Sequence, residues 1–260
     1  MKATISLAAL LVAPLLVTVG VATPATAQEQ TAIIVGGAQP LGQGTAYAWA
    51  AVDANGTAKS IGVNVSEAAL TSLPAQERVL LLDLPVPAHR AGYDHIGVNW
   101  NPHGHEPPAI YGLPHFDVHF YRISLAQQMA ILPADPRYAA KLEKAPPAAL
   151  LPAGYVRAPH GVPMMGAHWV NPASPEFHGQ AFTHTLVFGS YDGAVTFVEP
   201  MVTLAQLEKR TTVSTPVPAP ARFTGMMPTQ YSVTWDATAH EYGVSLDDLA
   251  KARGSAPGPR

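Results

Sequence analysis

Short runs of apolar residues, separated by proline, glycine and polar residues, dominate the chain and predict short strands. Asn55-Gly56 lies between two such runs, which is a strong hairpin signal, and Asp192-Gly193 marks a second hairpin. The most regular alternation covers residues 115–123. The expected strands are residues 32–35, 45–53, 59–65, 78–84, 96–100, 115–123, 155–158, 167–170, 182–189, 195–199 and 230–235.

Helices are expected only as short elements. Ser66 is placed to cap one, and Ser245 to cap a last one near the end of the chain. Residues 124–150 predict an inserted helical excursion with proline-rich joints, which would serve as a lid or an oligomer contact. The expected helical segments are residues 66–73, 125–131, 136–144, 203–209 and 246–252. The sequence therefore predicts a mainly β fold, barrel-like or sandwich-like, with a few short helices.

The first 27 residues predict a secretory signal peptide. Lys2 supplies the positive start, an apolar run follows, and Ala-Thr-Ala at residues 25–27 gives the small-x-small cleavage pattern. A retained membrane helix is the alternative, because the run approaches the ~20 residues that span a bilayer, but a proline and a glycine interrupt it. We therefore expect cleavage after Ala27, a secreted or periplasmic protein, and no stable membrane anchor.

β-rich chains of the size that remains after residue 27 often fold as one unit. We expect one β-rich domain at residues 28–212 and a C-terminal extension at 213–253 that packs on it as a linker, a strand and a short helix. Residues 254–260 are rich in glycine and proline and are expected to be a disordered tail.

Charge and cysteine content exclude several classes of protein. The formal net charge is −3, and removal of residues 1–27, which contain Lys2 and no acidic residue, changes it to −4. Without a basic stripe, binding to nucleic acid is not expected. The chain has no cysteine, so neither a disulfide nor a cysteine-linked lipid anchor is possible. Stability must come from the core, from oligomerisation or from a bound metal ion.

Histidines and carboxylates concentrate around the best-defined strand. Side chains alternate between the faces of a strand, so His115, Asp117, His119 and Tyr121 share one face. Such a row of polar groups is costly to bury without a function. Asp117 is either a metal ligand or the acceptor that orients a ligand imidazole, and Tyr121 fits a hydrogen-bonding core residue better than a ligand.

A second group of candidates precedes this strand. His103 and His105 form a His-x-His pair, followed at once by Glu106, on a loop rich in glycine and proline. On an extended segment such a pair can direct both rings to one ion, and imidazole is a ligand for several divalent transition metals. The competing interpretation is that these histidines only satisfy backbone groups or hold subunit contacts.

Two later residues could join the same centre. His168 lies in a turn bounded by glycine and proline, and Glu199 ends the apolar second strand of the late hairpin. The sequence therefore predicts a site for a divalent transition metal, with zinc as the first candidate. The expected ligands are His103, His105, His115, His119, His168 and Glu199, with Asp117 and Glu106 as alternative ligands or orienting partners.

Three functional classes remain open from these residues. The protein could bind metal passively, catalyse a metal-dependent reaction with Glu106 or Asp117 as acid or base, or be a purely structural envelope protein. A serine nucleophile turn, a phosphate-binding loop and a dinucleotide fingerprint are all missing from the sequence.

The runs WNPHGHEPPAIYGLPHFDVHFY, MGAHWVNP and FGSYDGAVTFVEPMVT resemble a family of uncharacterised secreted bacterial proteins. This TTHB-type domain of unknown function is related to a thermophile protein that responds to extracytoplasmic stress. The resemblance covers about residues 78–203. It implies a β-barrel-like subunit in a large homo-oligomeric ring, and it assigns no reaction.

A weaker resemblance is to cupins, small β-barrels that hold a metal ion with a His-x-His pair, a glutamate and a later histidine. His103 and His105 match the pair, and His168 matches the later histidine. Glu106 follows His105 too closely to match the cupin glutamate, so the spacing departs from that pattern.

Overall fold

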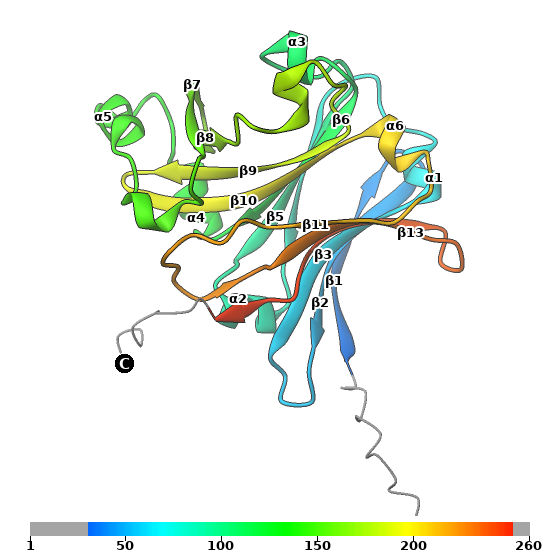
Figure 1. The fold of residues 1–260 in the computed structure, drawn as a ribbon. Helices are drawn as coiled ribbons and strands as arrows, with labels where there is room; N and C mark the ends of the chain where they lie inside the picture. Colours follow the sequence, from blue (N-terminus) through cyan, green and yellow to red (C-terminus); the bar gives the residue numbers. More distant parts are fainter. Residues whose placement is uncertain (1–30, 252–260) are drawn as a thin grey trace, which may run out of the picture.

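The computed structural model describes residues 31–251, which form two antiparallel sheets packed face to face (Figure 1). The expected signal peptide and the tail at 254–260 lie outside the described residues. The first sheet has the order β1-β2-β3-β14-β13-β11, with β1 (Ala32–Leu41), β2 (Gly44–Val52), β3 (Ala58–Ser66), β14 (Glu241–Asp247), β13 (Gln230–Asp236) and β11 (Val213–Pro216).

The second sheet has the order β4-β5-β6-β10-β9-β8-β7. Its strands are β4 (Arg78–Asp83), β5 (His95–Asn101), β6 (His115–Tyr121), β10 (Ala194–Thr203), β9 (His184–Tyr191), β8 (Gly166–Val170) and β7 (Val156–Val162). A small third sheet pairs β12 (Met226–Met227) with β15 (Ala250–Lys251).

The helices are short and lie at the ends and edges of the sheets (Figure 1). They are α1 (Glu67–Leu70), α2 (Val86–Ala91), α3 (Pro108–Tyr111), α4 (Leu125–Met129), α5 (Tyr138–Glu143) and α6 (Leu204–Leu207), with 3₁₀ turns η1 (Ala148–Leu150) and η2 (Pro175–His178). Within residues 31–251, no helix has the length and apolar character needed to cross a membrane.

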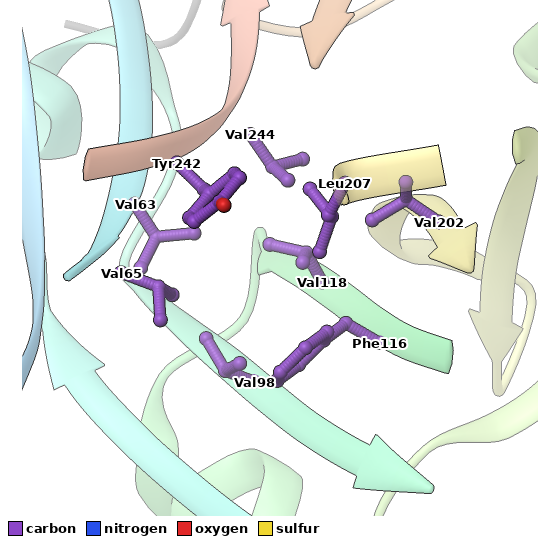
Figure 2. Close-up of a pocket in the computed structure, with 9 residues that line it drawn as sticks. All are labelled: Val63, Val65, Val98, Phe116, Val118, Val202, Leu207, Tyr242 and Val244. Carbon is purple, nitrogen blue, oxygen red and sulfur yellow. The ribbon is translucent and has the colours of Figure 1, made fainter. Parts of the chain in front are cut away.

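The main core fills the space between the two large sheets. Ile61 and Leu246 of the first sheet and Phe120 and Phe188 of the second are fully buried in it. Figure 2 shows a small apolar cavity at this interface, where side chains from both sheets and α6 point toward one another. Its lining consists of Val63, Val65, Val98, Phe116, Val118, Val202, Leu207, Tyr242 and Val244. Only Tyr242 carries a polar atom there, so this cavity is a packing feature and not a site for chemistry.

The mainly β fold class expected from the sequence is confirmed. Over the described residues neither large sheet closes on itself, so the sandwich-like alternative holds and the barrel does not. The first hairpin also forms as expected, because Gly56 adopts φ +72° and the Asp53 carboxylate accepts from the backbone N–H groups of Asn55 and Thr57.

The helical excursion at 124–150 is present and packs on the second sheet. Ser124 and Gln127 form a reciprocal capping box at the start of α4. The carbonyls of Lys141 and Lys144 accept from the backbone N–H groups of Asp192 and Gly193, which fixes the excursion to the turn between β9 and β10. Between β4 and β6 the structure adds α2 and α3, which were not among the expected helices, and each begins at a proline-containing first turn.

The helix expected at 246–252 is wrong. Ser245 does not cap a helix but lies within β14, where it pairs with Gly62 and Ser232. Tyr242, Val244 and Leu246 are buried in the core, and this spacing of two is that of a strand. Since β14 lies between β3 and β13, the C-terminal segment supplies inner strands of the first sheet.

We expect Leu246→Ala to lower the free energy of unfolding by about 2–5 kcal/mol, because it empties a fully buried position between two packed sheets. Chemical denaturation monitored by circular dichroism measures this. Leu132→Ala is the matched control, since Leu132 is 40 % exposed and should cost much less. Equal losses for the two variants would contradict the placement of β14.

Candidate metal centre

The candidate residues lie on the face of the second sheet that points away from the first sheet. On β6, Phe116, Val118 and Phe120 belong to the main core, and His115 and His119 therefore occupy the opposite face. Residues from both faces are nevertheless buried. This polar face is covered by α3 and η2, which contact each other through aromatic side chains.

The cover is built from aromatic residues. Tyr111 of α3 packs edge-on against Phe182 and Phe177, with ring centroids 5.1 Å and 6.2 Å apart. Figure 1 shows α3 and the segment that follows β8 at the same end of the second sheet. Phe182 also lies edge-on against His115, with centroids 5.4 Å apart. The polar face of β6 is thus shielded from water by two loop segments distant in sequence.

One group of candidate ligands, here called the inner triad, consists of His119 on β6, His168 on β8 and Glu199 on β10. Their ligand atoms all lie within 4.8 Å of one another. His119 Nε2 is 3.2 Å from Glu199 Oε1, and His168 Nε2 is 3.8 Å from Glu199 Oε2. The side chains of His119 and Glu199 are 1 % and 3 % exposed. Among the described residues, Nε2 of His119 and Oε2 of Glu199 have no hydrogen-bond partner.

Phe197 positions both inner imidazoles. Its ring centroid is 4.8 Å from that of His119 and 5.3 Å from that of His168. Gly189, the register partner of both Phe197 and His168, makes room for this ring, because a Cβ there would lie 2.1 Å from it. A glycine in the middle of β9 therefore serves the geometry of the inner triad.

A second group, here called the outer triad, consists of His105, His115 and Asp117. His115 Nε2 is 3.0 Å from Asp117 Oδ1, and His105 Nε2 is 3.4 Å from Asp117 Oδ2. His115 and Asp117 are buried, whereas the His105 side chain is 38 % exposed. The outer triad therefore lies where the covered face meets solvent.

Backbone carbonyls fix the tautomers of both outer histidines. Nδ1 of His115 is 2.6 Å from the Leu113 carbonyl oxygen, and Nδ1 of His105 is 2.8 Å from that of Glu106. A carbonyl can only accept, so each Nδ1 carries a hydrogen and donates it. Each Nε2 is then the atom that faces Asp117. Metal-binding histidines are oriented in this way, with the second ring nitrogen bonded to a carbonyl or carboxylate.

His103 and His105 do not converge on one ion as the sequence suggested. Gly104 between them has φ +67°, so the chain turns there and is not extended. The backbone N–H of His105 then donates to the Tyr111 carbonyl, which returns His105 over His115. His103 stays exposed and belongs to neither triad, and the same is true of Glu106.

Asn101 is a site residue that the sequence analysis missed. It lies opposite His115 in the β5–β6 register, and its Nδ2 donates to Asp117 Oδ2 at 2.7 Å. Both oxygens of Asp117 are therefore in contact with neighbours, which leaves this carboxylate poorly placed to act as a free base. Only the strand register could have identified Asn101.

Tyr121 continues the polar face as a packing residue. Its ring stacks between His95 and His119 at interplanar angles of 14° on both sides. The hydroxyl group of Tyr121 donates to the Met164 carbonyl at 3.4 Å. The nitrogens of His95 contact Asp94 and Gln128, so this histidine has a structural role.

The two triads differ in their electrostatics. Burial raises the pKa of Glu199 well above its usual range, and the charge of Asp117 raises it further. Burial lowers the pKa of His119 to about 3 and that of His168 to about 4. The inner triad thus favours neutral groups when it lacks a cation.

The outer triad instead favours charges. Burial alone would raise the pKa of Asp117, but contacts with His105 and His115 outweigh burial and lower it. Burial likewise opposes a charge on His105, yet the contact with Asp117 raises its pKa overall.

Both triads combine two imidazoles with one carboxylate, which are ligands that zinc and related divalent metals accept. With bonds of about 2.0–2.2 Å, neighbouring ligands of a tetrahedral zinc ion lie roughly 3.3–3.6 Å apart. The contacts of 3.0–3.8 Å in the two triads approach this spacing. The structure therefore contains two groups of His, Asp and Glu side chains that could hold a metal ion.

Comparison with known proteins gives a family without an assigned activity. Residues 53–100 match the model of the TTHB210-like family, described as hypothetical protein TTHB210. This confirms similarity to an uncharacterised domain family, but the matched segment overlaps the expected range of residues 78–203 only at 78–100. No curated protein and no solved structure matched the chain. The matched segment ends before both triads begin, so the family match carries no information about them.

Proposed function

We propose that this protein binds a divalent transition-metal ion, zinc first among them, through His119, His168 and Glu199. The observation that carries the proposal is that Nε2 of His119 and Oε2 of Glu199 are buried without hydrogen-bond partners among the described residues, in a group whose ligand atoms, including one of His168, all lie within 4.8 Å of one another. An unpaired buried polar group costs about 1–3 kcal/mol, and this site holds two of them. A cation at their common centre removes that cost.

The arrangement of strands supports this proposal. Three strands of one sheet, β6, β10 and β8, each contribute one ligand to the inner triad. Ligands on strands of one sheet are held more rigidly than ligands on loops. The burial of Glu199 points the same way, because a carboxylate that is buried without a positive partner gains most from a bound cation.

Zinc is the first candidate because its structural and catalytic sites accept imidazole nitrogen and carboxylate oxygen without a strong geometric preference. Two histidines and one carboxylate are also the ligand set of non-haem iron(II) sites, so iron(II) is the alternative ion. The leader-like residues 1–27 support the further proposal that binding takes place outside the cytoplasm.

Metal analysis of the purified protein after dialysis against zinc, and separately iron(II), tests the proposal. We expect bound metal in the wild type and loss of the inner ion in His168→Ala. His184→Ala is the matched control, since His184 is a partly buried histidine on β9 that belongs to neither triad. Metal content that is at background in the wild type, or equal in both variants, would refute the proposal.

A metal-dependent enzyme is the second candidate. Three protein ligands leave a coordination position for water or a substrate, as in catalytic zinc sites. Tyr111 is a buried group with an unused donor beside the outer triad: its hydroxyl has no hydrogen-bond partner among the described residues, and its ring lies 5.7 Å from that of His105. Activity that requires metal and is lost in His168→Ala would separate catalysis from passive binding.

A further inference from the structure

Both imidazoles of the outer triad are already oriented by backbone carbonyl groups. His105 and His115 each commit Nδ1 to a carbonyl and present Nε2 to the same carboxylate, Asp117. A neutral imidazole would bring a lone pair at Nε2 against the carboxylate oxygen, which is repulsive. A positive charge between nitrogen and oxygen would make both contacts favourable, and the buried His115 Nε2 and Asp117 Oδ1 have no hydrogen-bond partner among the described residues.

That charge can be two protons or one divalent ion. Two imidazolium groups and one carboxylate carry a net charge of +1, and so do two neutral imidazoles, one carboxylate and one divalent cation. An ion could thus replace the two protons without changing the net charge of the triad. Asn101 holds Asp117 in place in either case, through its bond to Oδ2.

We propose that the outer triad binds a second divalent metal ion, so that one sheet face holds two ions per chain. This inference rests on the proposed function for the inner triad and deepens it. The two sites share β6, since Asp117 of one and His119 of the other are two residues apart on the same face. That separation along a strand is about 6–7 Å, so the two sites are neighbours.

The two ions would differ in accessibility. His119 and Glu199 of the inner triad are almost fully buried, whereas the His105 side chain of the outer triad is 38 % exposed. The outer ion therefore has the solvent-facing coordination position. Water or a small anionic ligand, such as a carboxylate or a phosphate, is the chemistry that this position takes. The inner ion is the slowly exchanging one.

Zinc stoichiometry separates the sites. The purified wild-type protein is saturated with zinc, desalted and analysed for metal, and zinc release to a chromophoric chelator is followed over time. We expect two zinc ions per chain and two release phases, fast for the outer ion and slow for the inner. His105→Ala should lose one ion and the fast phase, and Glu199→Gln should lose one ion and the slow phase.

His103→Ala is the matched control. His103 is an exposed histidine on the same loop, two residues from His105 and outside both triads, so this variant should keep both ions. Circular dichroism and thermal unfolding confirm that each variant folds. The exposed position of His105 makes its replacement the least disruptive test of the outer triad.

The possible failures are distinguishable. One zinc ion that His105→Ala keeps and Glu199→Gln loses would overturn the second site and leave the proposed function standing. One ion that His105→Ala loses and Glu199→Gln keeps would overturn both the two-ion inference and the inner site. Loss of both ions in His103→Ala would overturn the assignment of the outer ligands, and no bound zinc at all would overturn both proposals.

Discussion

Replacement of Glu199 by glutamine is expected to abolish the stabilisation of this protein by the inner zinc ion while leaving the metal-free protein folded. Glutamine keeps the shape of the side chain and removes the anionic ligand. Because burial already favours the neutral form of Glu199, the neutral amide suits the metal-free site. Loss of a direct ligand should lower zinc affinity by more than the roughly 10–100-fold that loss of an orienting partner costs.

The size of the effect follows from linkage between binding and folding. Zinc at about 100 times its dissociation constant should stabilise the wild type by about 2.7 kcal/mol, since the ion binds the folded chain. For a chain of this length that corresponds to a rise in Tm of roughly 5–10 °C. In Glu199→Gln the contribution of the inner ion to this rise should vanish.

Thermal unfolding followed by circular dichroism, with and without zinc, measures the shift. Glu208→Gln is the control, because Glu208 is an exposed glutamate in neither triad and should leave the shift unchanged. A full zinc-dependent shift in Glu199→Gln would exclude Glu199 as a ligand. A metal-free Glu199→Gln protein that does not fold would show that this position serves stability instead.

Replacement of Gly104 by alanine is expected to destabilise the protein and to disrupt the outer triad together. A Cβ at this position would lie 2.1 Å from the Tyr111 carbonyl oxygen and 2.6 Å from the backbone of Gly112. Gly104 also has φ +67°, which costs a residue with a side chain about 1–2 kcal/mol. The collision is with backbone and cannot be relieved by rotating a side chain, so the loop must move, and His105 moves with it.

Gly56→Ala separates strain from collision. Gly56 has a similar φ of +72°, but a Cβ there would have no atom within 4 Å. We expect Gly56→Ala to cost about 1 kcal/mol and Gly104→Ala about 2–4 kcal/mol in the free energy of unfolding. Zinc analysis should show loss of the outer ion in Gly104→Ala alone. Equal destabilisation with metal content unchanged in both variants would contradict the close packing of this loop.

The sequence alone determined the features that depend on neighbours in the chain. The alternation on β6 separated His115, Asp117 and His119 from the core side chains, because successive residues of a strand face opposite sides. The turn at Asn55-Gly56 was readable for the same reason, since its φ requirement and the Asp53 contacts are local. The fold class follows from such local signals added along the chain.

Local signals were misleading where tertiary pairing decided the outcome. Ser245 followed by apolar residues is a plausible start of a helix, but pairing with β3 on one side and β13 on the other makes the same residues a central strand. The intrinsic helix preference of a short segment is weak compared with the pairing and burial that two flanking strands provide.

The partition of the candidate ligands was likewise decided by the tertiary structure. The β6–β10 register and the order of the strands bring Glu199 and His168 to His119, and no spacing along the chain encodes that meeting. The left-handed turn at Gly104 separates His103 from His105. On an extended segment, the two rings of this His-x-His pair would have faced one ion. One site expected from the sequence became two groups because strand order and register, not chain proximity, set which side chains share a centre.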